Sequence, residues 1–179
     1  MIKIKEKVIA ILAVLTITVS GALAASSGPG QGLTEKKVRK ELVTLPYYGV
    51  FDNLAYKVEG DTVTLYGQVV RPSTRKDAER RIRKIEGVDR VVNNIEVLPV
   101  SGFDNTIRAR AYRAIFRTGS LYRYAQGANP SVHIIVRNGH ITLEGVVANR
   151  MDSQLAYTAA SSIPGVFSVT NNLRVESGS

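Results

Sequence analysis

Cysteine is absent from the 179 residues of this sequence. Its absence excludes disulfide bonds, and it excludes a lipid anchor attached to an N-terminal cysteine. The lack of disulfides does not argue against export from the cytoplasm. Because 44% of the residues are apolar, a chain of this length can bury stable cores without them.

Histidine is scarce, and the two that occur, His133 and His140, form no recognisable site. Neither has the i, i+4 partner or the acidic neighbour that a metal site or a catalytic triad requires. Asp77 and Glu79 belong to a mixed-charge stretch, which favours solvated side chains over a carboxylate pair. No glycine is followed by the Gly-Lys-Ser/Thr of a phosphate loop. We predict structural or surface histidines, no metal, no cofactor and no enzymatic activity.

The apolar run near the N-terminus is short. It covers residues 8–19, is broken by Thr16 and Thr18, and falls below the ~20 residues needed to cross a bilayer. Three lysines precede it and Ala22-Leu23-Ala24 follows it, which is the pattern of a cleavable signal peptide over residues 1–24. An uncleaved membrane anchor is the alternative interpretation.

Basic residues outnumber acidic ones, with 24 lysines and arginines against 15 aspartates and glutamates, a net charge of +9. Removal of residues 1–24 takes away three lysines and one glutamate. That leaves 21 basic and 14 acidic side chains, or +7. An exported protein rarely meets nucleic acid, so we expect its anionic partners to be lipid headgroups or polymers of the cell envelope.

An internal repeat is the most specific signal in the sequence. A shift of 78 residues places residues 58–97 over residues 136–175 without a gap. The matching anchors are Thr64-Leu65-x-Gly67 with Thr142-Leu143-x-Gly145, Ile85-x-Gly87-Val88 with Ile163-x-Gly165-Val166, and Val91-x-Asn93-Asn94 with Val169-x-Asn171-Asn172. The repeat divides the chain into two small domains.

The first domain is predicted over residues 33–98, after a flexible leader at 25–32. Its expected elements are a helix from Thr34 to Leu45, a hairpin with its turn at residues 59–61, a second helix opened by Arg71 and stopped at Gly87, and a last strand to Val97. The last strand should join the hairpin in a three-stranded mixed sheet with both helices on one face, an α+β fold.

The second domain is predicted over residues 103–176, with the same order of elements. The linker at 99–102 is short, so the two lobes should touch. We expect Asp104 to cap the first helix and Asn138-Gly139 to form the hairpin turn. The connection at residues 119–130 is longer than its counterpart in the first domain. Ile135 and Val146 fall on the outer sheet face, where packing between lobes or dimerisation would cover them.

The helix at residues 107–117 has an unusual outward face. At 100° per residue, its core face contains Ile107, Ala111, Ala114 and Ile115. Tyr112 and Phe116 lie on the opposite side with arginines around them, although an ordinary surface helix is polar there. The corresponding positions of the first domain are Lys36, Lys40 and Val43.

Two interpretations of this face remain open. In the first, Tyr112 and Phe116 enter the headgroup region of a membrane while arginines bind lipid phosphates. The predicted lipid-binding residues are then Arg108, Arg110, Tyr112, Arg113, Phe116, Arg117, Tyr122 and Arg123. In the second, the two aromatic residues pack under the long connection or against the first lobe. The basic second helix of the first domain is another candidate patch, but its interspersed carboxylates favour a solvated face.

The repeated pattern resembles the BON domain, which is named for bacterial OsmY and nodulation proteins. The likeness is carried by residues 60–67 and 139–145 and by the two Gly-Val and Val-x-Asn-Asn motifs. A signal peptide followed by two such units resembles the OsmY type. The resemblance implies an αββαβ fold, a periplasmic location, attachment to phospholipid or envelope proteins, and no catalysis.

These observations lead to one main hypothesis and one alternative. The main hypothesis is a non-enzymatic periplasmic protein that binds anionic phospholipid through the first helix of its second domain. Such a protein would maintain the envelope under stress, including osmotic stress. The alternative is a protein-binding or chaperone-like periplasmic module. The sequence leaves the oligomeric state undetermined.

Overall fold

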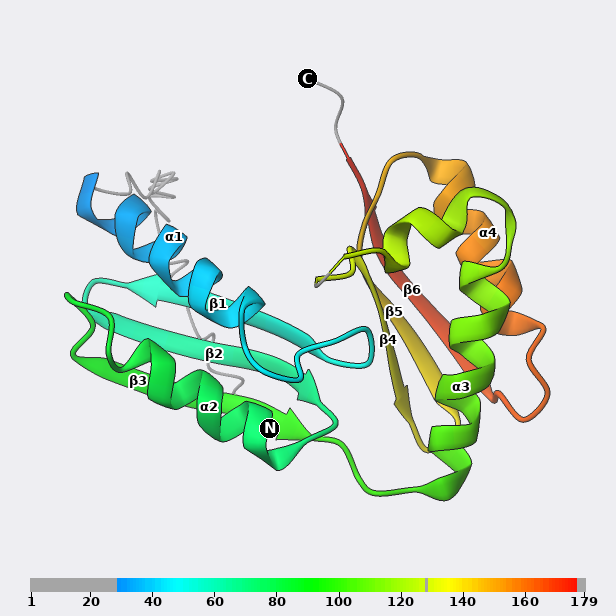
Figure 1. Ribbon diagram of the computed structural model, residues 1–179, viewed down its shortest axis with the longest axis horizontal. Helices are drawn as coiled ribbons and strands as arrows, with labels where there is room; N and C mark the ends of the chain where they lie inside the picture. Colours follow the sequence, from blue (N-terminus) through cyan, green and yellow to red (C-terminus); the bar gives the residue numbers. More distant parts are fainter. Residues whose placement is uncertain (1–28, 128, 177–179) are drawn as a thin grey trace, which may run out of the picture.

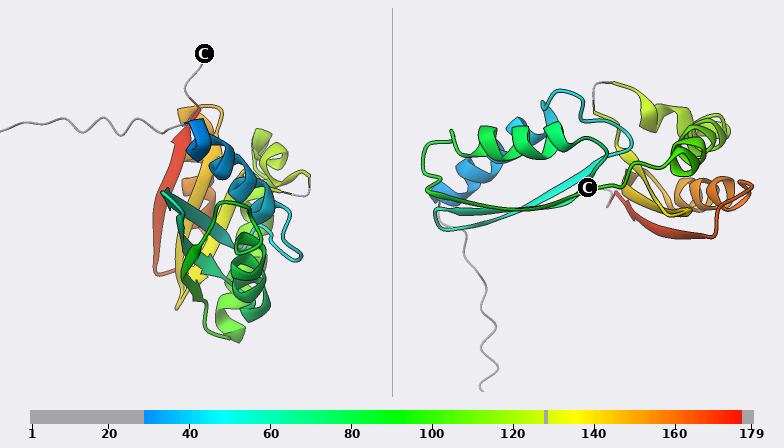
Figure 2. Two further views of the ribbon diagram at one scale, coloured as in Figure 1. Left: turned by 90° about the vertical axis from the view of Figure 1, so that its left-hand side faces the viewer. Right: turned by 90° about the horizontal axis from the view of Figure 1, so that it is seen from below.

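The computed structural model describes residues 29–127 and 129–176. The predicted signal peptide at 1–24 and the first part of the leader lie outside the described residues. The described chain forms two lobes, and in each lobe the helices cover one face of a small sheet (Figures 1 and 2). Among the residues described, no helix has the length and apolar character needed to span a membrane.

Both lobes have the predicted order of helix, two strands, helix and strand. Lobe 1 consists of α1 (Pro29–Val43), β1 (Asn53–Glu59), β2 (Thr62–Val69), α2 (Pro72–Ile82) and β3 (Arg90–Val97). Lobe 2 consists of α3 (Gly102–Phe116), the 3₁₀ helix η1 (Gly119–Ala125), β4 (Val132–Arg137), β5 (His140–Val147), α4 (Arg150–Ser161) and β6 (Ser168–Val175). The predicted α+β fold is therefore confirmed.

The sheets are mixed, as predicted. In lobe 1, β2 is the middle strand, antiparallel to β1 and parallel to β3. In lobe 2, β5 takes the same position between β4 and β6. The parallel pair requires a crossover, which α2 and α4 provide. Each lobe buries its own apolar cluster between its sheet and its helices.

Gly67 and Gly145, which match in the repeat, lie on the middle strands opposite Leu54 and Val132, at the start of the neighbouring strand. Their φ angles are +114° and +120°, a region that L side chains rarely adopt. A Cβ at Gly67 would overlap the carbonyl oxygen of Asn53, and a Cβ at Gly145 would overlap that of Ser131. Glycine is therefore required at both positions by the backbone itself.

The start of α1 differs from the prediction. The helix begins at Pro29 rather than at Thr34, so residues 29–32 of the expected flexible leader are helical. The residues concerned are proline, glycine and glutamine, and they carry no apolar periodicity. A helix start inferred from apolar spacing therefore falls one turn too late.

Asp104 does not cap α3, contrary to the prediction. Ser101 is the N-cap residue, and its hydroxyl accepts a hydrogen bond from the Asp104 backbone N–H at 3.1 Å. The Asp104 carboxylate is fully buried and accepts hydrogen bonds from the backbone N–H groups of Asn138 (2.8 Å) and Gly139 (2.9 Å). It therefore fixes the β4–β5 turn to the start of α3, a long-range contact that local capping rules do not reveal.

The long connection of lobe 2 is folded onto its own lobe. It forms η1, whose Tyr124 hydroxyl donates to the buried carboxylate of Asp152 at 2.5 Å. Ser120 donates to the same carboxylate at 3.0 Å, and Arg123 forms an ion pair with it. These hydrogen bonds, that from Tyr124 first, hold the pKa of Asp152 below its usual value. The network ties η1 to the first turn of α4.

The two lobes touch, as the short linker predicts. The loop at residues 47–52 of lobe 1, the junction loop, lies along β4 of lobe 2. The Ile134 N–H donates to the Val50 carbonyl at 2.7 Å, and His133 Nδ1 lies 3.2 Å from the Gly49 carbonyl oxygen. Farther along β4, Arg137 forms an ion pair with Glu96 of β3 at 2.8 Å.

Ile135 is buried between these contacts. It shares the outer face of β4 with His133 and Arg137, both of which contact lobe 1, and only 5% of its surface is exposed. The helices of lobe 2 lie on the other side of the sheet, so lobe 1 supplies the cover for this face (Figure 2). Packing between lobes and dimerisation were the two ways in which Ile135 could be covered. The structure therefore shows packing between lobes.

His133 makes the lobe junction sensitive to pH. Its ring is buried against Tyr48, with centroids 5.5 Å apart, and burial lowers its pKa although Gly49, Asp52 and Glu144 oppose the shift. A base whose folded-state pKa is lowered takes up a proton less readily when folded than when unfolded. Its contribution to stability is therefore complete above the unfolded pKa of about 6.5 and is lost as the pH falls below it.

We expect the free energy of unfolding to decrease between pH 7.5 and pH 5.5, and to decrease less in His133→Gln. Burial also raises the pKa of Asp52 and raises that of Tyr48 to about 12. Asp52 favours the folded state at lower pH and Tyr48 titrates far above the window, so neither accounts for a loss of stability there. Urea denaturation followed by circular dichroism at both pH values measures the difference. Equal decreases in the two proteins would show that His133 is not responsible.

Candidate functional site

Phe116 is part of the core of lobe 2 and does not lie on an outward face. It is 7% exposed and packs in one cluster with Leu121 and Tyr124 of η1. At 100° per residue, Phe116 lies on the side of the helix opposite Ile107. However, η1 covers the end of α3, so residues on both sides of its last turn are buried. Its assignment to an exposed lipid-binding face is therefore wrong, and packing under the long connection is confirmed.

Tyr112 faces the first lobe. It is 41% exposed, and its ring meets those of Phe51 in the junction loop and Phe116 edge to face, with centroids 6.3 and 5.1 Å apart. Such contacts are favourable for aromatic rings. The aromatic stripe predicted from the sequence is therefore largely used for packing within the protein. The chaperone-like alternative depended on the same stripe and loses its proposed client surface.

Arg108 is buried, with 4% of its surface exposed, and it lies where α3 faces the junction loop of lobe 1. Its Nη1 donates to Asn105 Oδ1 and its Nη2 to the Val136 carbonyl, both at 2.7 Å. Burial lowers its pKa, although Asp104 and Asp52 oppose the shift. A guanidinium held this way cannot reach a membrane surface, so Arg108 is removed from the candidate site.

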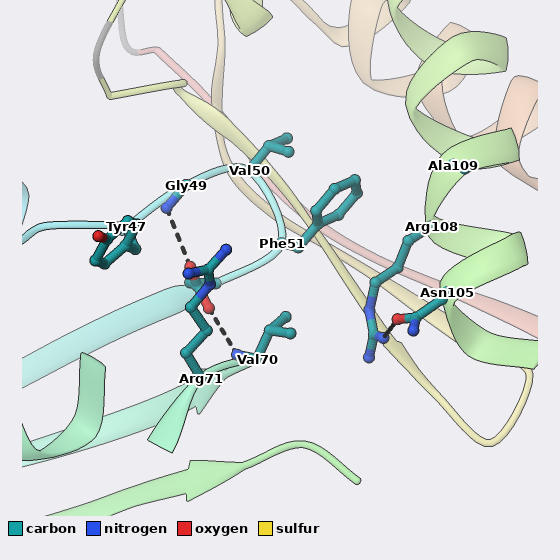
Figure 3. A pocket seen from close by; sticks show the side chains of 10 residues that line it. Tyr47, Gly49, Val50, Phe51, Val70, Arg71, Asn105, Arg108 and Ala109 are labelled. Carbon is teal, nitrogen blue, oxygen red and sulfur yellow. Dashed lines mark hydrogen bonds between the residues drawn. The ribbon is translucent and has the colours of Figure 1, made fainter. Parts of the chain in front are cut away.

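A groove of about 380 Å³ lies between the junction loop and α3 (Figure 3). Asp52 lines it and accepts hydrogen bonds from the backbone N–H groups of Gly49 (3.1 Å) and Val70 (2.7 Å), drawn as dashed lines in Figure 3. Arg71 stacks over the Tyr47 ring at 4.6 Å. Asp52 and Arg71 are thus both engaged in contacts within the protein. We interpret the groove as part of the packing between the lobes.

Three arginines of α3 and its C-cap remain on the surface: Arg110, Arg113 and Arg117, here called the arginine face. They border an open hollow of about 570 Å³ between α3 and the end of α4. Arg110 donates to the Pro164 carbonyl at 3.0 Å, and Arg113 donates to the Ala109 carbonyl at 3.2 Å. None of the three forms an ion pair with any residue that the structure describes. Within that part of the chain, the face therefore presents three positive charges without protein counterions.

The basic helix α2 provides a contrast. Arg80 pairs with Asp77 at 2.6 Å, and Arg83 pairs with Glu79 at 2.5 Å. Arg81 pairs with Glu41 of α1 at 3.3 Å. Exposed pairs add little stability, but they neutralise the arginines involved. The solvated mixed-charge interpretation of α2 is consistent with this arrangement.

The last two predicted lipid-binding residues lie beyond the far end of α3. Tyr122 is 58% exposed, in η1. Arg123 is held by Asp152 and by the Tyr124 hydroxyl, and hydrogen bonds to these two groups raise its pKa. Arg123 is thus a partner of the η1 network. The structure does not bring these residues into the arginine face.

Two exposed aromatic residues lie at the other end of α3, and sequence analysis did not select them. Phe103 is 49% exposed and Phe167 is 69% exposed, and their ring centroids are 6.1 Å apart. Phe103 precedes Arg110 by seven residues, or two helical turns, and this spacing could have identified it. No pattern links Phe167 to α3, because the two residues are distant in sequence.

The described part of the chain contains no cluster of three or more residues suited to a metal ion. His133 lies at the lobe junction, and His140 Nδ1 lies 2.7 Å from the Ser168 hydroxyl. Both contacts are structural, which agrees with the interpretation made from the sequence.

A known protein family matches both lobes of this chain. The BON domain model matches residues 32–99 and again residues 104–177. The chain belongs to the BON domain family. The two matches coincide with the two lobes, so each lobe is a BON domain, and the resemblance noted in the repeat is confirmed. The family is generally non-enzymatic.

Comparisons with individual proteins add little to this assignment. No curated protein matches the chain. The C-terminal domain of CdsD, a structural protein of the type III secretion system of Chlamydia trachomatis, is similar at 10% identity and a TM-score of 0.33, over 79% of this chain and 96% of that one. A second CdsD structure gives 10% identity and a TM-score of 0.31, over 78% and 90%. At this level neither likeness bears on what these BON domains do.

Proposed function

We propose that this tandem BON protein is a non-enzymatic periplasmic component of the cell envelope that binds anionic phospholipid through the arginine face of α3. The observation that carries the proposal is the absence of counterions, among the residues described, around Arg110, Arg113 and Arg117, in contrast to the paired Arg80, Arg81 and Arg83 of lobe 1. Export through the predicted signal peptide would bring the face to the membrane surface. Membrane attachment under envelope stress is the role that this chemistry supports.

The physical case rests on charge and on geometry. Guanidinium groups donate in a fork that fits phosphate oxygens, and each basic residue near an anionic leaflet contributes about 1 kcal/mol. Arg110 and Arg117 are two turns apart on one side of α3, about 10 Å along the helix axis. The hollow beside them, lined by Ala114 and residues 162–164, is open to solvent. Several headgroups can therefore be contacted together.

We expect the variant R110E/R113E/R117E to lose vesicle binding by at least about 100-fold, because three favourable charges of about 1 kcal/mol each are reversed. The measurement is co-sedimentation of residues 25–179 with vesicles of phosphatidylglycerol and phosphatidylcholine at low salt. Binding of the unmodified protein should weaken as salt is added, since screening reduces the attraction.

The matched control is K36E/K76E/K84E, which changes the net charge equally but alters exposed lysines of lobe 1. It should bind nearly as well as the unmodified protein. Equal losses in both variants would mean that net charge acts rather than this face. No binding of the unmodified protein at low salt would refute the lipid proposal, and unchanged binding of the arginine variant would place the site elsewhere. Circular dichroism verifies that both variants are folded.

A further inference from the structure

Phe103 and Phe167 are exposed together at one end of lobe 2. Phe103 belongs to the first turn of α3, and Phe167 belongs to the connection between α4 and β6. Figure 1 shows the start of α3 and this connection at the same end of the lobe. With exposed fractions of 49% and 69% and rings 6.1 Å apart, they form an apolar tip at this end. Contiguous exposed apolar surface marks interaction sites in many proteins.

The tip is held in place by its surroundings. Its rings lie over two glycines: a Cβ at Gly139 would come within 2.6 Å of the Phe167 ring and 3.1 Å of the Phe103 ring, and one at Gly165 would come within 3.5 Å of Phe103. The Phe167 N–H also donates to the Gly139 carbonyl at 2.9 Å. The phenylalanines are therefore packed against a hydrogen-bonded turn.

Lobe 1 offers an internal comparison at the same place. The repeat shift of 78 residues matches Phe167 with Asp89 and Gly139 with Asp61. Lobe 1 thus has two carboxylates where lobe 2 has an exposed ring and the glycine beneath it. The apolar tip is a property of the second lobe and not of the repeated fold.

The tip is continuous with the arginine face. Phe103, Arg110 and Arg117 follow one another at seven-residue intervals, so they lie on one side of α3 over about 21 Å. The α4–β6 connection joins the two features from the other side. Its Pro164 carbonyl accepts a hydrogen bond from Arg110, residues 162–164 line the arginine hollow, and Phe167 follows three residues later.

We infer that Phe103 and Phe167 form an insertion tip that enters the interfacial region of an anionic phospholipid bilayer, while the arginine face binds the headgroup phosphates beside it. Aromatic rings favour the membrane interface, and the neighbouring arginines of the arginine face make an anionic surface the complementary occupant. The inference rests on the proposed function and adds an orientation, with the start of α3 toward the acyl chains and η1 farther from them.

The experiment uses tryptophan fluorescence, because the natural chain contains no tryptophan. Phe167→Trp places a single reporter at the tip. Tyr122→Trp places one beyond the opposite end of α3, at a residue that is 58% exposed. Each protein is mixed with vesicles of phosphatidylglycerol and phosphatidylcholine, with and without lipids brominated on the acyl chains. We expect emission from the Phe167→Trp protein to shift to the blue and to be quenched by at least half, and emission from the Tyr122→Trp protein to change little.

Parallel co-sedimentation separates the two proposals. If both proteins sediment with vesicles but the Phe167→Trp reporter is not quenched, the insertion tip is refuted while lipid binding stands. If neither sediments, the proposed function itself fails. Quenching of the Tyr122→Trp reporter alone would mean the opposite orientation and would also overturn the inference. As an independent check, F103S/F167S should bind at least tenfold more weakly while the protein stays folded, since both side chains are about half exposed or more. Undiminished binding would contradict insertion.

Discussion

Gly145→Ala is expected to destabilise lobe 2 by about 3 kcal/mol or more, and Gly67→Ala to do the same in lobe 1. Two costs combine at each position. A φ of +114° or +120° strains any L residue, and the added Cβ would overlap the carbonyl oxygen of Asn53 or Ser131 and come within 2.9–3.0 Å of the carbonyl carbon. The strands would have to separate to accommodate it. Urea denaturation followed by circular dichroism measures the loss.

Gly60→Ala is the matched control for these variants. Gly60 also has a positive φ, +62°, but nothing lies within 4 Å of the position that a Cβ would take. Only the conformational cost of about 1–2 kcal/mol applies. If Gly145→Ala were no less stable than Gly60→Ala, the close approach of Ser131 to the middle strand would be disproved.

Phe116→Asp is expected to unfold lobe 2 or to destabilise it by about 3–5 kcal/mol or more. Large-to-small changes at buried aromatic positions cost about that much, and an unpaired carboxylate among Leu121, Tyr124 and the α3 core adds a desolvation cost. Tyr112→Asp, one turn earlier and 41% exposed, should cost much less. Urea denaturation of the two variants gives the comparison. Similar stabilities would show that Phe116 is not part of the core.

This expectation affects how membrane binding is tested. A loss of vesicle binding in Phe116→Asp would follow from unfolding and would say nothing about the surface of α3. Arg110, Arg113 and Arg117 can be changed without loss of an ion pair to any described residue or of buried apolar contacts. They therefore report on the surface itself.

The order of the elements could be predicted because the repeat shows the same period twice. Alternation around Val63 and Leu65, the glycine at 67 and the Asn-Gly turn at 138 each specify local structure that neighbouring residues reinforce. The mixed sheet follows from these signals, since a third strand after a helix can pair in parallel with a hairpin strand. Local patterns and the overall fold agree, as expected for scaffold residues.

The predictions that proved wrong concern Phe116, Asp104 and Arg108, whose contacts join residues distant in the sequence. A helical angle gives the direction of Phe116 but not what covers that direction, and here η1 covers it. Asp104 looks like a cap because capping is local, whereas its carboxylate binds a turn 34 residues later. Arg108 resembles a surface arginine in the sequence, although its fork reaches the Val136 carbonyl.

The candidate site shows the same limit. The arginine face could be predicted from α3 alone, because Arg110, Arg113 and Arg117 lie on one side of a single helix. The aromatic tip could not, because Phe167 reaches Phe103 only after β6 has paired beside β5. Contacts between residues that are distant in the sequence depend on tertiary packing. A single sequence contains no periodic pattern that indicates such contacts.

The contact between the junction loop and β4 is head-to-tail: a connection from one lobe covers the edge strand of the next. Contacts of this type can be repeated without limit, as in filaments, unless the last unit lacks the projecting segment. In lobe 2 the equivalent connection is η1, and the Tyr124–Asp152 network binds it back to α4. The segment of lobe 2 that corresponds to the junction loop is thus folded onto its own lobe and does not project as the junction loop does.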